Sequence, residues 1–249
     1  MNPNVLLLRL EGPLQSWGLR ARWDVRDTHT EPTKSGIVGL LACALGYPKG
    51  DPRMESQLYQ GLLFGVRVDK PGNIRKDYQT VSGFLPTAEG SFKHSGVQTA
   101  KKLTILQQRW DAVPATIVTP HYYLEDASFL AALQERPTHS GIINECSEAL
   151  RNPKWPLFLG RKCCIPSLPI RYKYTNEYSS LLEALRSEPI SEASKRKIGD
   201  KLRVYFDSDL HDYSTTSPHS SIQDVPLAGP TRLYGFRFQG CDEVEVPQL

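Results

Sequence analysis

Apolar residues in the first two thirds of the chain fall into short runs that predict a mixed fold of strands and helices. Residues 5–10 are almost continuously apolar, which is typical of a strand covered in the middle of a sheet. Residues 35–45 have the length and apolar content of a helix, and residues 62–68 predict a second strand. Further strand patterns lie at 77–81, 103–106, 116–123 and 155–159, and further helical patterns lie at 127–133 and 142–150.

The order of these elements predicts a fold class. With residues 82–100 set aside, the order is strand, helix, strand, strand, helix, strand, which is the ferredoxin-like plan shared by RNA-recognition modules. Residues 82–100 are rich in Gly, Ser, Thr and Lys and have no periodicity, so they predict a projecting loop that is disordered when free or ordered by a partner. A smaller second unit is expected after residue 170, with strands at 170–174, 202–206 and 233–238 and a helix at 178–186.

The helix at 35–45 has clear start and stop signals. Thr33 and Ser35 are both good N-cap residues, and Gly46 is a typical helix end. The first turn of a helix carries unpaired N–H groups and the positive end of the dipole, so a phosphate placed there would find donors, and Lys34 would add a full charge. The same pattern also fits a well-capped core helix that binds nothing. No glycine precedes Lys34 at P-loop spacing, which argues against nucleotide hydrolysis.

The net charge of +3 hides an uneven distribution of charged residues. Residues 151–173 contain six basic side chains and no acid, and residues 67–110 hold eight basic against three acidic residues. Aromatic residues lie among them, so these two stretches suit a polyanion that also presents flat bases, although a charge run is more often only a solvated face. The aromatic residues are Tyr78, Trp110, Trp155, Phe158 and Tyr172.

Metal and cofactor chemistry has little support in the sequence. The five cysteines form no CxxC pair, and the adjacent Cys163 and Cys164 cannot easily chelate one metal, so reduced thiols and no cofactor are expected. The segment 207–212 resembles a metal-ligand cluster, but it lacks residues that an EF-hand loop needs, which favours a solvated loop. No apolar stretch approaches the roughly 18 residues of a membrane span, and no signal region is present, so a cytoplasmic protein is expected.

Two further patterns bear on RNA. Residues 232–238 loosely resemble the aromatic strand of RNA-recognition modules, although alternating aromatic residues in a strand more often belong to a core. His94, with Tyr78 or Lys101, would supply the base and the proton donor for metal-independent cleavage at an RNA 2′-hydroxyl. No GxSxG, HExxH or paired-carboxylate signature strengthens an enzymatic interpretation.

Five segments in order along the chain are specific when they are taken together: LRLEGPLQSWG (8–18), PTKSGIVGL (32–40), YQT (78–80), YLEDAS (123–128) and PLFLGRK (156–162). They resemble the CasD family, the crRNA 5′-handle subunit of type I-E CRISPR Cascade complexes. The resemblance covers most of residues 5–170, and residues 224–226 and 232–235 extend it into the tail. It implies an RNA-recognition-like domain at 1–170 with a thumb insertion at 82–102, and a small β-rich domain at 171–249.

The resemblance also implies a role and a set of partners. Such a subunit caps one end of a backbone filament, grips the crRNA handle, contacts the large subunit that reads the PAM, and meets target DNA through the assembled complex, with no membrane involved. The thumb would fold over the guide and displace a base. The residues implied to contact RNA are Gln15, Ser16 and Trp17, then Thr33, Lys34, Ser35 and Gly36 at the helix start, then Tyr78, Thr80, Arg161 and Lys162.

Two alternatives to a non-catalytic RNA-binding subunit stay open at this point. Type I-C members of the wider family cleave precursor RNA through Tyr, Lys and His, so a metal-independent endoribonuclease with Tyr78, His94 and Lys101 is one alternative. The matched segments favour the type I-E branch, where a separate endoribonuclease cuts. The other alternative is a protein-only scaffold whose basic patches meet acidic partners.

Overall fold

The protein is described by a computed structural model, which covers residues 2–18, 25–83, 115–194, 200–207, 219–226 and 234–245. The strands of the larger sheet are β1 (Val5–Glu11), β3 (Leu62–Lys70), β6 (Ser128–Glu135), β7 (Arg171–Thr175), β8 (Lys201–Asp207), β9 (His219–Pro226) and β10 (Tyr234–Glu245). Those of the smaller sheet are β2 (Leu14–Gln15), β4 (Asn73–Gly83) and β5 (Ala115–Glu125). The larger sheet has the order β7-β1-β6-β3-β8-β10-β9 and the smaller one β2-β5-β4. All neighbouring strands in both sheets pair antiparallel.

Helix α1 begins and ends at the residues that the sequence indicates. The Thr33 side chain accepts a hydrogen bond of 3.2 Å from the amide of Gly36, and Gly46 ends the helix in the left-handed conformation with φ of 77°. No helix within the described residues is long and apolar enough to cross a membrane. The helical elements are α1 (Lys34–Leu45), η1 (Met54–Tyr59), α3 (Ile142–Arg151), α4 (Leu181–Ser187) and η2 (Glu192–Ser194).

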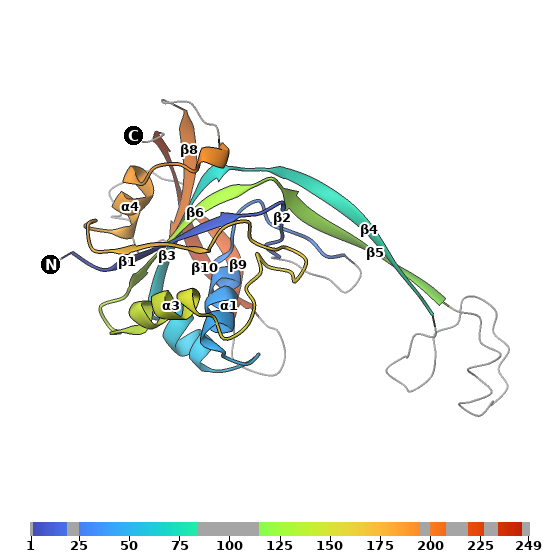
Figure 1. Cartoon of the computed structure of the whole chain (residues 1–249), viewed down its shortest axis with the longest axis horizontal. Coiled ribbons are helices and arrows are strands. Elements are labelled where there is room, and N and C mark those ends of the chain that lie inside the picture. Colours follow the sequence, from blue (N-terminus) through green and yellow to red (C-terminus); the bar gives the residue numbers. More distant parts are fainter. Residues whose placement is uncertain are drawn as a thin grey trace.

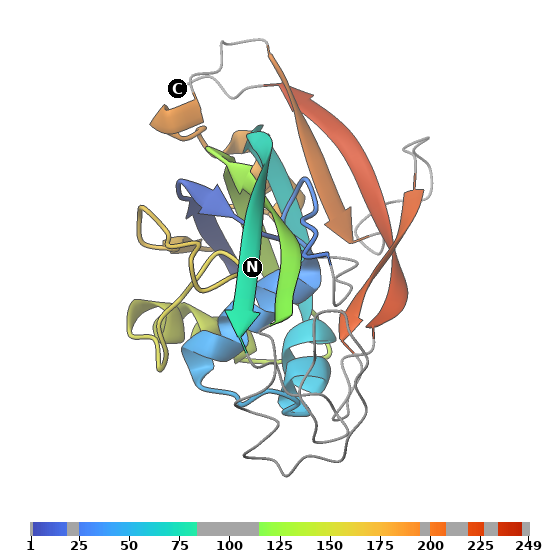
Figure 2. The same ribbon diagram turned by 90° about the vertical axis from the view of Figure 1, so that its right-hand side faces the viewer.

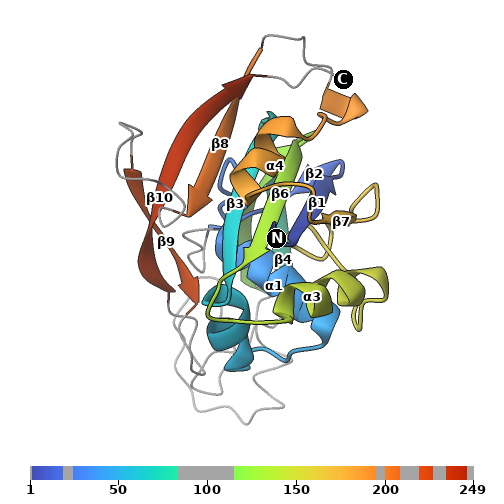
Figure 3. The same ribbon diagram turned by 90° about the vertical axis from the view of Figure 1, so that its left-hand side faces the viewer.

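Helices cover both faces of the larger sheet, which explains why β1 is apolar at almost every position. Leu6, Leu8 and Leu10 pack in one core cluster with residues of α1 and α3. Val5 and Leu7 point to the other face and pack in a second cluster with residues of α4. Figures 1 and 3 show α1 and α3 together on one side of the sheet and α4 on the other. Successive strand residues point to opposite faces, so a strand buried on both faces needs no polar alternation.

The predicted order of strand, helix, strand, strand, helix, strand is present, but two of its elements lie elsewhere in the chain. With β2, η1, β4 and β5 left out, the elements β1, α1, β3, β6, α3 and β7 follow the expected order. The predicted helix at 127–133 is wrong, because these residues largely form β6 between β1 and β3. A short apolar run has the same sequence pattern in a buried strand as in a buried helix. The predicted strand at 155–159 is also wrong, since the last strand of this series is β7.

The strands after residue 170 extend the same sheet as the first half of the chain. β7 pairs with β1 at one edge, and β8 pairs with β3 on the other side of the sheet. β10 and β9 then continue the sheet outward from β8, which Figure 2 shows in orange and red. The division expected near residue 170 therefore does not separate two sheets.

A long hairpin projects from the body of the molecule (Figure 1). Its strands, β4 and β5, pair from Asn73 opposite Glu125 to Gly83 opposite Ala115. The expected strands at 77–81 and 116–123 are parts of these longer strands. Apart from its first two residues, the thumb expected at 82–102 lies outside the described residues, as does the strand expected at 103–106.

Candidate nucleic-acid interface

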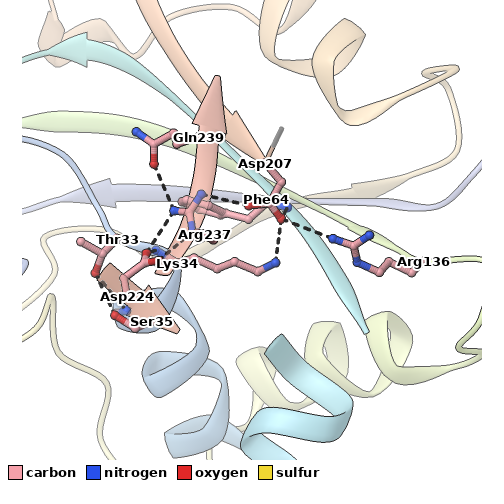
Figure 4. A network of polar contacts seen from close by, with 10 residues as sticks. Thr33, Lys34, Ser35, Phe64, Arg136, Asp207, Asp224, Arg237 and Gln239 are labelled. Atoms are coloured by element: carbon pink, nitrogen blue, oxygen red, sulfur yellow. Dashed lines mark hydrogen bonds and ion pairs between the residues drawn. The ribbon is translucent and has the colours of Figure 1, made fainter. Parts of the chain in front are cut away.

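The anion at the start of α1 is a carboxylate of the protein itself. Oδ2 of Asp224, on β9, accepts a hydrogen bond of 2.9 Å from the backbone amide of Lys34. The guanidinium of Arg237 holds the same carboxylate from the other side, with Nε to Oδ1 at 2.7 Å and Nη2 to Oδ2 at 3.0 Å. Figure 4 shows these residues side by side. The helix start does attract an anion, as its dipole and free amides require, and the tertiary structure supplies that anion from β9.

The side chain of Lys34 is equally committed to an internal partner. Its Nζ donates to Oδ2 of Asp207 at 2.6 Å. The same oxygen accepts a hydrogen bond from the Phe64 amide at 3.2 Å, and Oδ1 of Asp207 accepts one from Arg237 at 3.1 Å. Lys34 is only 2% exposed, and burial lowers the pKa of its ammonium against the opposing effect of Asp207. The pKa of Arg237 is raised instead. Burial acts to lower it, but the hydrogen bond to Asp224 and the charges of Asp224 and Asp207 outweigh burial.

This ion network occupies the start of α1, where the sequence predicts a contact with an RNA phosphate, and that contact stays a prediction. Thr33 and Lys34 are buried, and Ser35 Oγ lies 3.3 Å from Thr33 Oγ1. Lys34 connects the helix start to the C-terminal strands through Asp224 and Asp207. The network connects α1 to β8, β9 and β10, which are far away in sequence. Asp207, expected in a solvated loop, is likewise buried in the network.

The segments around residues 15–17, 33–36 and 160 meet in space through buried contacts. Gln15 donates to the carbonyls of Leu10 and Ala127 at 3.0 and 2.8 Å and accepts from the Trp17 indole at 3.0 Å. A Cβ on Gly36 would lie 2.8 Å from the Trp17 ring, and one on Gly160 would lie 1.8 Å from the carbonyl oxygen of Ser16. Both glycines thus permit close packing. The side chains of Gln15, Ser16 and Trp17 are buried, and their contact with RNA stays a prediction.

Arg161 and Lys162 are adjacent in sequence but differ in what they contact. The Arg161 guanidinium lies 4.8 Å from the centre of the Tyr123 ring and donates to the carbonyls of Arg26 and Asp27 at 2.8 and 3.2 Å. It therefore fastens the segment 25–29 to the base of the hairpin. Lys162 is exposed.

The projecting hairpin carries the exposed basic and aromatic residues that suit RNA. We define the hairpin patch as Lys76, Tyr78 and Thr80 on β4 together with Tyr122 on β5. Lys76 and Tyr122 are paired across the strands, so their side chains share one face with Tyr78 and Thr80. Lys76 Nζ lies 6.0 Å from the Tyr78 ring centre and 5.9 Å from that of Tyr122. Tyr78 is 65% exposed, so its ring is available for stacking.

Several basic residues counted in the two basic stretches are not available to a polyanion. Arg67 is fully buried and binds Asp69, with Nε to Oδ1 at 2.6 Å. Arg171 donates to Ser147 at 2.8 Å, and Lys173 pairs with Glu177 at 2.7 Å, which raises the pKa of Lys173 through that hydrogen bond. The sequence counts charges, whereas the structure shows that Arg67 and Lys173 are paired with carboxylates and that Arg171 is hydrogen-bonded to a neutral hydroxyl.

The aromatic strand near the C-terminus is the clearest reversal of a sequence expectation. Its rings were expected in the core, but Phe236 and Phe238 on β10 are 70% and 66% exposed, and Tyr234 is also exposed. Alternate strand positions share a face, so these rings form one exposed row. The residues between them face inward, where Arg237 joins the ion network.

Of the three residues of the catalytic alternative, Tyr78 lies in the described part of the chain, and His94 and Lys101 lie outside it. Sequence reasoning missed a different pair: His121 Nδ1 lies 3.4 Å from the Tyr123 hydroxyl on β5, beside Arg161. Burial, followed by the charges of Arg161 and Arg26, lowers the pKa of His121. In the sequence, the spacing of two residues between His121 and Tyr123 within a predicted strand could have indicated that their side chains share a face.

Comparison with known proteins gives consistent matches. Residues 5–239 match the family model described as CRISPR-associated protein (Cas_Cas5). The chain is 31% identical over 173 residues to CRISPR system Cascade subunit CasD of Escherichia coli (strain K12), covering 66% of this chain and 68% of that protein. A chain of a CRISPR RNA-guided surveillance complex superposes with a TM-score of 0.71 at 29% identity, covering 98% of this chain and 91% of that one. A second solved structure, of a Cas protein, has a TM-score of 0.59 at 28% identity, covering 98% and 95%.

Proposed function

Because the chain belongs to the Cas5 family of CRISPR-associated proteins, we propose that it is a non-catalytic Cascade subunit that binds the 5′ handle of the crRNA. In this role it caps the backbone filament and contacts both the backbone subunits and the large subunit of the antiviral surveillance complex. The relatives described above are Cascade and surveillance-complex proteins, which supports an assembly role.

The observation that carries the proposal is the hairpin patch. A single-stranded RNA needs cations along its backbone and flat rings for its bases, and Lys76, Tyr78 and Tyr122 offer both on one face. The hairpin stands away from the body, so both an RNA and a neighbouring subunit can approach it (Figure 1). Lys162 adds an exposed charge beyond the base of the hairpin.

The arrangement of the larger sheet supports the ferredoxin-like part of the proposal. Four of its strands are neighbours in the order β7-β1-β6-β3. Along the chain, α1 lies between β1 and β3, and α3 lies between β6 and β7; the two helices pack together on one face of the sheet. We propose that this unit is the RNA-recognition-like domain and that the hairpin of β4 and β5 leads into the thumb.

Salt-dependent binding tests the proposal directly. The purified chain is titrated into fluorescently labelled single-stranded RNA of the CRISPR repeat, and affinity is measured across a range of salt concentrations. Lys76→Ala should reduce the log–log salt slope by about 0.7, because one phosphate contact to a single strand is lost. Tyr78→Ala should weaken binding by about 1 to 3 kcal/mol, whereas Tyr78→Phe should retain it because the ring remains.

A matched control is available on β8. Lys201 is exposed and pairs with Glu243 at 3.1 Å, far from the hairpin patch in the fold, so Lys201→Ala should leave the salt slope unchanged. Equal slopes for Lys76→Ala, Lys201→Ala and the unaltered chain would remove the hairpin patch from the proposal.

A nuclease assay separates the binding role from the endoribonuclease role. The repeat RNA should stay intact after incubation with the purified chain in EDTA, and specific cleavage under these conditions would replace the binding role with the endoribonuclease role.

A further inference from the structure

Two adjacent thiols lie in the segment between α3 and β7, and the proposed function uses neither of them. Cys163 is exposed, whereas Cys164 is fully buried and belongs to the core cluster of α1 and α3. Two backbone hydrogen bonds close the loop that carries them, from the Leu159 amide to the Cys164 carbonyl at 2.8 Å and from the Cys164 amide to the Arg161 carbonyl at 2.9 Å. One sulfur of the pair is therefore open to reagents, and the other is shielded from them.

The surroundings of Cys163 are those of a reactive cysteine. Arg161 and Lys162 directly precede it, and no acidic residue occurs between positions 151 and 173. The Cys163 thiol donates a hydrogen bond of 3.5 Å to the hydroxyl of Tyr123, and the Arg161 guanidinium lies 4.8 Å from the centre of the same ring. Exposed cysteines in electropositive surroundings are the ones that oxidants attack.

Cys164 is placed to react with Cys163 and with little else. Burial raises the pKa of its thiol to about 12, and the charge of the neighbouring Cys163 side chain adds to this effect, so the two side chains interact. A reagent in solution does not reach a sulfur that is fully buried. An oxidised sulfur on the preceding residue does reach it, because adjacency in the chain gives the two groups a high effective concentration.

A disulfide between neighbouring residues is strained and therefore easily reduced. Consecutive Cα atoms lie about 3.8 Å apart across a trans peptide. An ordinary disulfide joins Cα atoms that are roughly 4.4 to 6.8 Å apart. Strained disulfides have more oxidising potentials and are the labile ones, whereas structural disulfides resist reduction. A bond between Cys163 and Cys164 would thus respond to redox conditions and would not act as a permanent crosslink.

We propose that Cys163 and Cys164 form a reversible oxidation site, at which a hydroperoxide converts the two thiols into a vicinal disulfide. The Cys163 sulfur attacks one peroxide oxygen and the O–O bond breaks. The sulfur loses two electrons and becomes a sulfenic acid, and the other oxygen takes up the thiol proton and leaves as an alcohol or as water. The Cys164 sulfur then attacks that of Cys163, the S–O bond breaks, and hydroxide leaves as water with the Cys164 proton. A dithiol reductant reverses the bond by thiol–disulfide exchange.

The disulfide should loosen the base of the hairpin. Ring closure draws the Cys164 side chain out of the core and removes the hydrogen bond from Cys163 to Tyr123. The ring also distorts the peptide groups that close the loop. Arg161 belongs to this loop and holds the segment 25–29 against Tyr123, so a distorted loop weakens that hold.

Peroxide treatment of the full, reduced chain tests the site. After treatment with hydrogen peroxide the remaining thiols are alkylated, and the digested protein is analysed by mass spectrometry. The peptide that contains Cys163 and Cys164 should be unalkylated and lighter by two hydrogens, and dithiothreitol should restore both thiols. Cys164→Ala keeps an apolar core residue but removes the second sulfur, so Cys163 should then carry a sulfenic acid that dimedone labels. Cys43→Ala, at a cysteine without an adjacent cysteine, is the control and should still form the disulfide.

Hydrogen exchange tests the consequence for the hairpin. The Tyr122 amide donates to the Arg26 carbonyl at 2.8 Å, where the segment 25–29 meets β5. This amide should exchange about tenfold faster in the oxidised chain, and reduction should restore its protection. The amides of β8, which lies between β3 and β10, serve as the control and should not change. In Cys163→Ser, peroxide should leave the exchange at Tyr122 unaltered.

The outcomes bear on this inference separately from the proposed function. The oxidation site would be overturned if Cys163 kept its thiol after peroxide, or if it carried a sulfinic acid or a dimedone adduct while Cys164 was still alkylated. A vicinal disulfide with unchanged exchange at Tyr122 would overturn its effect on the hairpin. None of these experiments contains RNA, so their failure leaves the proposed function to the salt slope of Lys76→Ala.

Discussion

The Asp224 carboxylate accepts a hydrogen bond of 2.9 Å from the amide of Lys34, across 190 positions of the chain. The first turn of α1 is thereby occupied by a carboxylate from β9, and the side chain of Lys34 is paired with Asp207. This relationship joins the C-terminal strands to the first helix. The side chain of Lys34 is thus engaged inside the protein, whereas Lys76 and Tyr78 on the hairpin are exposed.

Removal of one carboxylate from the network should be strongly destabilising. In Asp207→Asn the ammonium of Lys34 loses its partner in a buried site, and the expected loss of unfolding free energy is about 3 to 5 kcal/mol. Urea unfolding followed by circular dichroism measures it. Glu243→Gln breaks the exposed pair with Lys201 and should cost less than about 1 kcal/mol. Similar losses in the two variants would show that the buried network contributes no more than a surface pair.

Two glycines of α1 should respond in opposite directions to alanine. A Cβ on Gly36 would lie 2.8 Å from the Trp17 ring, whereas one on Gly39 meets nothing within 4 Å. Gly39→Ala should therefore stabilise the protein by about 0.5 to 1 kcal/mol through helix propensity. Gly36→Ala should destabilise it by about 1 to 2 kcal/mol, because the clash with Trp17 outweighs that gain. Thermal unfolding of both variants gives the comparison, and a stabilised Gly36→Ala would show that Trp17 can move aside.

The stability of the protein should fall in alkaline solution partly because of Cys146. Burial raises the pKa of its thiol from 9.0 to about 12. The folded state holds this proton more tightly than the unfolded state, so the contribution is complete below the unfolded pKa and is lost as pH rises toward the folded one. The loss approaches about 1.4 kcal/mol per pH unit in that window.

Unfolding measured from about pH 8 to about pH 10.5 should show a smaller loss in Cys146→Ala than in the unaltered chain, by about 2 kcal/mol. Cys163→Ala, at an exposed cysteine, is the control and should follow the unaltered chain. The same pH dependence in Cys146→Ala would mean that other groups carry the effect.

The adjacent thiols of Cys163 and Cys164 should differ in reactivity. Cys163 is exposed, whereas Cys164 is buried and its pKa is raised to about 12, chiefly by burial. At neutral pH the thiolate of Cys164 should be about a thousandfold rarer than that of an ordinary thiol. A disulfide reagent added to the native protein should therefore show a fast phase that Cys163→Ser removes and Cys164→Ser leaves. A fast phase that survives in Cys163→Ser would place the reactive thiol elsewhere.

Local signals predicted the elements that depend on neighbouring residues alone. Thr33 caps the start of α1, and Gly46 ends it in the left-handed conformation. Both signals involve residues within one helical turn, so the local sequence contains them. The pattern at 127–133 wrongly predicts a helix, because its continuous apolar residues reflect burial on both faces of a sheet. That burial depends on β1, β3 and the helices packed over them.

The sequence by itself determined the strand at 5–10, the capped start and the end of α1, and the resemblance to the family to which the chain belongs. Only the tertiary structure decided which anion lies at the start of α1, since Asp224 reaches Lys34 through the pairing of β8, β10 and β9. It likewise decided that Phe236 and Phe238 face solvent while Arg67 is buried. Charge and hydrophobicity are properties of a residue, but exposure and pairing are set by distant segments, which no local pattern contains.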